Sequence, residues 1–67
     1  MNAHRTIANE AIQKATDSEM TVYLPYHFEV ECALMAHCDH ASVFTGIDSK
    51  EHRVFRTPEW RVLLVGA

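Results

Sequence analysis

The stretch that decides the fold is MTVYLPYHFEVECAL, residues 20–34. Every even-numbered position in it is apolar or aromatic, while the odd positions include Thr21, His27, Glu29 and Glu31. This period of two is typical of half-buried β-structure. In a helix, Glu29 and Glu31 would lie about 200° apart around the axis, one on each side. The pattern therefore predicts strand.

Pro25 interrupts this stretch near its middle. Proline has no N–H to donate to a strand ladder, and its fixed φ suits the second position of a turn. We therefore predict two strands that fold back at residues 24–27 as a β-hairpin. The alternative is a helix over residues 29–37, which has good helix propensity and would leave a two-helix α+β fold with three or four strands.

A helical period precedes this stretch. Asn2 is suited to be the N-cap, and the apolar residues that recur at helical spacing are Ile7, Ala8, Ala11, Ile12 and Ala15. We predict an amphipathic helix over residues 3–16. Because its apolar face is mostly alanine, it should cover one end of the core.

Three further strands are expected downstream, over residues 42–47, 52–56 and 60–65, because these segments are rich in β-branched and aromatic residues and are separated by turn residues. The predicted fold class is α+β, with one helix followed by a five-stranded, strongly bent antiparallel sheet. All 67 residues belong to one small domain, with the helix at 3–16 and a barrel at 20–65.

Four short segments carry a family resemblance: TVYL at residues 21–24, FEVECAL at 28–34, HCDH at 37–40 and VFR at 54–56. Their spacing resembles the Sm-like (SH3-like) small barrels, in particular the Hfq-like and Rof-like groups of small bacterial proteins. An Hfq-like member would imply a homo-oligomer that binds single-stranded RNA. A Rof-like member would imply a protein that acts by occupying a nucleic-acid-handling protein.

Charge sets limits on the partners. The net charge is −3, which gives no general attraction for phosphate backbones or anionic membranes. No apolar run approaches ~18 residues and no signal-peptide pattern opens the chain, so we expect a cytoplasmic protein without membrane association. The two cysteines are then expected as reduced thiols.

An acidic docking surface is the first functional hypothesis. Acids outnumber bases six to two over residues 1–40, and complementary charge raises association rates and specificity. We interpret the chain as a small non-enzymatic regulatory module that binds a protein partner through this surface. The Rof-like resemblance implies that this partner is a nucleic-acid-handling protein. The carboxylates that would form this surface are Glu10, Asp17, Glu19, Glu29 and Glu31.

Single-stranded RNA is the alternative partner. Small barrels stack bases on aromatic side chains that have arginines between them. Strand alternation puts Phe28 and Phe44 in the core and leaves Tyr23 exposed. The residues for this function are Tyr23, Arg53, Phe55, Arg56 and Arg61.

A small zinc site is the third hypothesis, because thiolate and imidazole are ligands that zinc prefers. Its ligands would be Cys32, His37, Cys38 and His40, although Cys32 and Cys38 are farther apart than the usual two to four residues. Cys38 with His37 or His40 could serve as nucleophile and base, but no third orienting group or oxyanion hole is visible, and the chain has no glycine-rich phosphate motif. We therefore expect no enzymatic activity and no cofactor.

The last predicted strand suggests assembly. Residues 62–65 read VLLV, which puts hydrophobic side chains on both faces of a strand expected to have a free edge. Pairing between subunits would bury that edge. We predict a homo-oligomer with Leu63 and Val65 in the interface.

Overall fold

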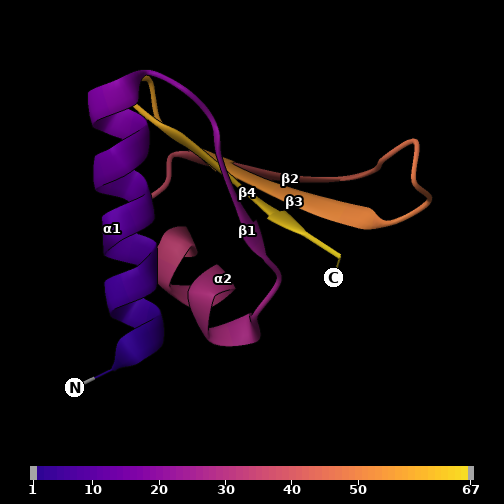
Figure 1. The fold of residues 1–67 in the computed structure, drawn as a ribbon, viewed down its shortest axis with the longest axis horizontal. Helices are drawn as coiled ribbons and strands as arrows, with labels where there is room; N and C mark the ends of the chain where they lie inside the picture. Colours follow the sequence, from indigo (N-terminus) through magenta and orange to yellow (C-terminus); the bar gives the residue numbers. More distant parts are fainter. Residues whose placement is uncertain (1, 67) are drawn as a thin grey trace.

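The computed structural model describes residues 2–66, which fold into two layers. The elements are α1 (Ala3–Ser18), β1 (Val22–Pro25), α2 (Phe28–Met35), β2 (His40–Thr45), β3 (Glu51–Arg56) and β4 (Arg61–Val65). The sheet order is β1-β4-β3-β2, with β1 parallel to β4 and the other neighbours antiparallel (Figure 1). Of the helices in residues 2–66, none has the length and apolar character needed to cross a membrane.

The N-terminal helix α1 begins where the sequence predicts and runs on to Ser18. The side chain of Asn2 caps it by accepting hydrogen bonds from the backbone N–H groups of His4 and Arg5, at 3.0 and 3.2 Å. The helix ends at Glu19, whose left-handed φ of 59° lets its N–H reach the carbonyl of Ala15.

The predicted hairpin over residues 20–34 is wrong. Only its first part is a strand, β1, and α2 begins at Phe28. His27 starts this helix, because its Nδ1 accepts a hydrogen bond from the N–H of Glu29 at 3.1 Å. Glu29 and Glu31 lie in the first turn, where a negative charge is favourable next to the positive end of the helix dipole.

The apolar even positions were misleading because Val30 and Leu34 are four residues apart. A spacing of four fits one face of a helix as well as a period of two, and both of these side chains are buried. Phe28 is on the other side of the helix and is 65% exposed, contrary to the expectation that it lies in the core.

The five-stranded antiparallel sheet is also wrong. The described residues form four strands in a mixed sheet, with α2 between β1 and β2, so the fold is α+β with two helices. The Sm-like strand arrangement is therefore not the arrangement of this chain, and the family resemblance itself stays a prediction.

The last strand is not an edge. β4 lies between β1 and β3, with Leu63 opposite Tyr23 on one side and Val54 on the other. The free edge that was the reason to place Leu63 and Val65 in an oligomer interface does not exist. Of the described strands, β1 and β2 are the two edges.

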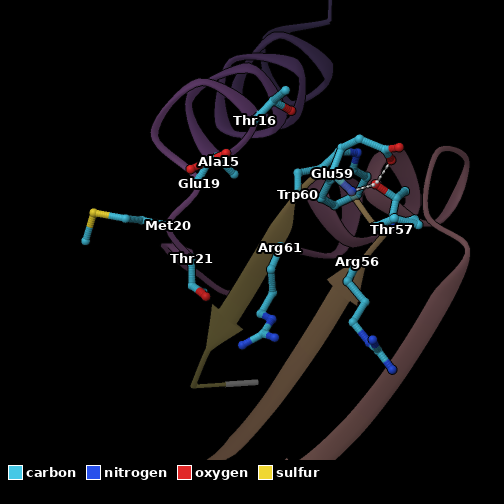
Figure 2. Close-up of a pocket in the computed structure, with 11 residues that line it drawn as sticks. Ala15, Thr16, Glu19, Met20, Thr21, Arg56, Thr57, Glu59, Trp60 and Arg61 are labelled. Carbon is cyan, nitrogen blue, oxygen red and sulfur yellow. Dashed lines mark hydrogen bonds between the residues drawn. The ribbon is translucent and has the colours of Figure 1, made fainter.

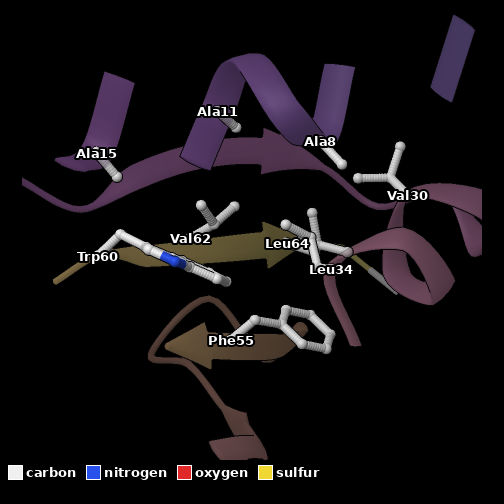
Figure 3. Packing of buried hydrophobic residues seen from close by; sticks show 9 residues of the cluster. All are labelled: Ala8, Ala11, Ala15, Val30, Leu34, Phe55, Trp60, Val62 and Leu64. Atoms are coloured by element: carbon white, nitrogen blue, oxygen red, sulfur yellow. The ribbon is translucent and has the colours of Figure 1, made fainter. Parts of the chain in front are cut away.

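The core lies between the helices and one face of the sheet (Figure 3). Phe55, Val62 and Leu64 point from β3 and β4 toward both helices. The alanines of α1 allow this helix to approach the sheet closely, while α2 contributes its two buried aliphatic side chains. The full buried hydrophobic set is Ala8, Ala11, Ala15, Val30, Leu34, Phe55, Trp60, Val62 and Leu64.

Candidate binding surface on the open face of the sheet

On the opposite face of the sheet there is no helix of the described part of the chain, residues 2–66. Successive side chains of a strand alternate between faces, so the residues next to Val62, Leu64 and Phe55 point away from the helices. The strand register then assigns this surface, which we call the open face, to Tyr23, Pro25, His40, Ser42, Phe44, His52, Val54, Arg56, Arg61, Leu63 and Val65.

Charge is distributed unevenly between the two faces of the sheet. Within the described strands no Asp or Glu points to the open face, because Glu51 is on the helix side. Arg56 and Arg61 do point to it, and His40 continues their row onto β2. A chain with a net charge of −3 therefore has one face free of strand carboxylates.

Arg56 and Arg61 are direct cross-strand partners at the end of β3 and the start of β4. Both are exposed, and their side chains extend side by side in the same direction (Figure 2). Within residues 2–66, no carboxylate forms a salt bridge with either guanidinium. Like charges directly opposite each other are unfavourable in a sheet, so a bound anionic group would stabilise this pair.

An open pocket of about 640 Å³ adjoins the arginine pair, between the end of α1 and the turn that joins β3 to β4. Thr57 builds this turn: its N–H donates to the carbonyl of Trp60 at 3.0 Å, and its hydroxyl accepts from the N–H of Glu59 at 3.1 Å and donates to the Glu59 carboxylate at 3.0 Å. Glu59 and Glu19 also line the pocket. This turn therefore keeps the two arginines opposite each other, beside a pocket whose lining includes a hydroxyl group and two carboxylates.

An apolar band crosses the open face next to the arginines. Tyr23 at one edge is 65% exposed, as the sequence predicts, and Phe44 at the other edge is 44% exposed. Phe44 was expected in the core; it lies instead on the face that no helix covers. Leu63 and Val54, which are half-buried, continue the row from Tyr23 and Ser42 ends it, while Phe44 lies in the next row, opposite His52.

The residues predicted to bind RNA are divided between the two faces. Tyr23, Arg56 and Arg61 share the open face, whereas Phe55 is 2% exposed in the core and cannot stack on a base. Arg53 is on the helix side, where its Nε is 2.8 Å from a Glu31 carboxylate oxygen. The structure therefore does not bring Phe55 and Arg53 together with the other three residues on one surface.

Arg53 belongs to a structural cluster that joins α2 to β3. Its guanidinium lies over the ring of Tyr26 at 5.1 Å from the centroid, and Tyr26 donates its hydroxyl hydrogen to Glu31 at 2.8 Å. This hydrogen bond to a carboxylate raises the pKa of Tyr26 above its usual value. Glu31 is thus occupied by two partners within the chain.

The five predicted acidic residues do not form one surface. Glu10 and Asp17 are on an exposed side of α1 together with Lys14, and Gln13 donates a hydrogen bond to Asp17 at 2.9 Å. Glu19 lines the pocket beside the arginines, and Glu29 lies at a separate hollow with its carboxylate 3.4 Å from His4 Nδ1. With Glu31 paired to Arg53, these carboxylates point to separate parts of the molecule.

The predicted zinc ligands are not brought together. Within residues 2–66, no three His, Cys, Asp or Glu side chains are placed to hold a metal ion. Cys32 is exposed on α2, while Cys38 is half-buried against the core. His40 is on the open face, at the first position of β2.

His40, Phe44 and Val54 share the open face, which was not predicted from the sequence. The sequence signal for this surface was the alternation in HASVFT and EHRVFR, whose even-numbered residues all point to the open face.

In comparisons with known proteins, no family model, curated protein or solved structure matches this chain. Its function therefore has to be inferred from the surface itself.

Proposed function

We propose that this protein is a non-enzymatic binding module that docks a protein partner on its open face. The observation that carries the proposal is the unpaired Arg56–Arg61 pair beside an exposed apolar band, on a face without strand carboxylates. Arginine and tyrosine are enriched among the residues that dominate binding energy at protein interfaces. The partner is expected to present a carboxylate to the arginines and an aliphatic or aromatic side chain to Leu63.

This proposal moves the binding surface away from the one predicted from the sequence. The carboxylates of α1 are interspersed with Lys14 and have solvent around them, which is the ordinary state of a surface helix. The open face, by contrast, leaves apolar side chains in water, and such a band gains free energy when a partner covers it.

A single-stranded RNA is the second candidate partner. It is favoured by Tyr23, which is exposed and adjoins Arg61 diagonally across β1 and β4, as in surfaces that stack bases between cations. Two unpaired arginines would release few counterions, however, and the net charge is negative. The protein partner is therefore the better-supported proposal.

Affinity capture with matched charge variants tests the proposal. Arg61→Glu places a carboxylate opposite Arg56, which should keep the strands together while it removes the positive pair. Arg5→Glu is the control, because it changes the net charge equally on the exposed side of α1. After nuclease treatment of the lysate, wild type and Arg5→Glu should retain the same protein, and Arg61→Glu should retain at least about tenfold less.

Two results would contradict the proposal. Equal capture by Arg61→Glu would show that the open face is not the docking surface. Loss of the captured material on nuclease treatment would favour the RNA candidate, which a labelled single-stranded oligonucleotide then tests directly: its binding should weaken with salt and with Tyr23→Ala.

A further inference from the structure

The edge strand β2 is the most exposed element of the sheet. All six of its residues are exposed, including Val43 on the helix side at 56% and Phe44 on the open face. Among the described strands it pairs with β3 alone, and the hairpin that these strands form extends away from α1 (Figure 1). The helices therefore cover neither face of this strand.

The backbone of β2 has an outward row of hydrogen-bonding groups that have no partner among residues 2–66. The N–H of Gly46 donates to the carbonyl of Lys50 at 2.9 Å, which makes these two residues a hydrogen-bonded pair. Such pairs alternate with non-bonded pairs along an antiparallel ladder. Even-numbered residues of β2 therefore bond to β3, and the N–H and C=O groups of Ala41, Val43 and Thr45 point outward.

Nothing in β2 blocks strand addition. Exposed edges in natural proteins are usually protected by lysine, proline, a bulge or a short strand length. The segment HASVFT has no Lys, Arg, Asp, Glu or Pro, and its register with β3 is continuous over residues 40–45. The other edge, β1, has four residues and ends in Pro25, so it is protected in this way.

We propose that β2 pairs antiparallel with β2 of a second copy of the chain, about a two-fold axis at Val43. In this register Val43 is opposite its own counterpart and Ala41 is opposite Thr45, so every outward N–H meets an outward C=O. On the open face the small Ser42 is opposite the large Phe44, which avoids a clash. The two open faces then form one continuous surface.

A second copy suits this edge because the paired segment carries no formal charge, so two copies of it can pair without repulsion between like charges. Residues 39–56, which span the hairpin, carry three acids and three bases, and α1 is at the opposite end of the molecule from the hairpin (Figure 1). The charge of −3 on each copy therefore opposes the pairing only weakly. An edge contact is smaller than the ~1,600 Å² of a standard interface, so we expect micromolar affinity.

Sedimentation velocity of the purified chain over about 1–500 μM tests this proposal, because the range brackets a micromolar dissociation constant. Wild type should approach twice the 7.6 kDa chain mass at the highest concentration. Val43→Pro removes one outward N–H, and proline is tolerated where an edge N–H faces solvent. It should raise the dissociation constant at least about tenfold.

Three further variants make the result decisive. Val43→Lys should likewise raise the dissociation constant at least about tenfold, and it replaces Val43→Pro if circular dichroism shows that the proline variant is unfolded. Gln13→Lys adds the same charge on α1 and should leave the dimer unchanged. Leu63→Glu should also leave it unchanged, because Leu63 is on the open face of a central strand. A monomeric wild type, or a dimer lost with Leu63→Glu and kept with the Val43 variants, would overturn the proposal.

Discussion

The two faces of the sheet carry side chains of different kinds although they come from the same strands. On β4, Val62 and Leu64 are buried under both helices, while Arg61, Leu63 and Val65 alternate with them on the open face. On β3, Arg53 is held by Glu31 on the helix side, whereas Arg56 has no salt-bridge partner in residues 2–66. The comparison indicates that the helix side maintains the fold and that the open face is available for binding.

The largest expected contrast is between two neighbouring leucines. Leu64→Ala should lower the free energy of unfolding by about 2–5 kcal/mol, because it leaves a cavity in the core. Leu63→Ala should lower it by about 1 kcal/mol, since this half-buried side chain loses less contact. Urea unfolding of both variants measures the difference, and equal losses would contradict the assignment of the faces.

Two arginines of β3 provide the next contrast. Arg53→Met leaves Glu31 without its cation and should cost about 1–3 kcal/mol. Arg56→Met removes repulsion from Arg61 and should leave stability unchanged or raise it by up to about 0.5 kcal/mol. A double-mutant cycle with Glu31→Gln should show coupling for Arg53 and none for Arg56. Coupling of similar size at both positions would contradict this picture.

The N-cap of α2 is the third test, because its side chain contributes to the free energy of unfolding on the helix side. His27→Ala removes the acceptor for the N–H of Glu29 and should destabilise the protein by about 1 kcal/mol. It also removes the ring stacked on His4 at 3.8 Å between centroids. His27→Asn keeps an acceptor and should retain most of the stability, whereas His37→Ala, at an exposed position beyond α2, should have no effect in thermal unfolding.

The smallest effect is expected at the turn that joins β2 to β3. The N–H of Lys50, at 3.1 Å, and the nearby His52 lower the pKa of the Asp48 carboxyl from its usual 3.8. A carboxyl with a lowered folded pKa contributes stability above its unfolded pKa and loses it as the pH falls through the folded value. The small advantage of wild type over Asp48→Asn in melting temperature should therefore shrink from about pH 5 to about pH 3. An advantage that grows over this range would contradict the assignment.

The sequence predicted those parts of the fold whose local pattern had one interpretation. The helix α1 has a clear cap at Asn2 and an alanine stripe of helical period. In α2, the apolar residues Val30 and Leu34 fit both a strand and a helix, and the capping role of His27 decides between them. That role depends on a side-chain geometry that residue spacing does not reveal.

The open face was predicted only in part, because strand pairing is a tertiary property. Alternation within EHRVFR and RVLLV puts Arg56 and Arg61 on definite sides of their strands. The parallel pairing of β1 with β4, which brings Tyr23 beside Leu63, joins segments far apart in the chain. The contact of Glu31 with Arg53 also joins segments far apart in the chain. The sequence had placed these two residues on different surfaces, the acidic one and the RNA-binding one, whereas in the structure they pair with each other.

Methyl NMR of the protein with its captured partner tests the central claim most directly, because methyl shifts report contacts of individual side chains. If the open face is the docking surface, the methyl groups of Val54, Leu63 and Val65 should shift on binding, and those of Ile7 on the exposed side of α1 should not. Shifts confined to α1, with the open-face methyl groups unchanged, would contradict the account.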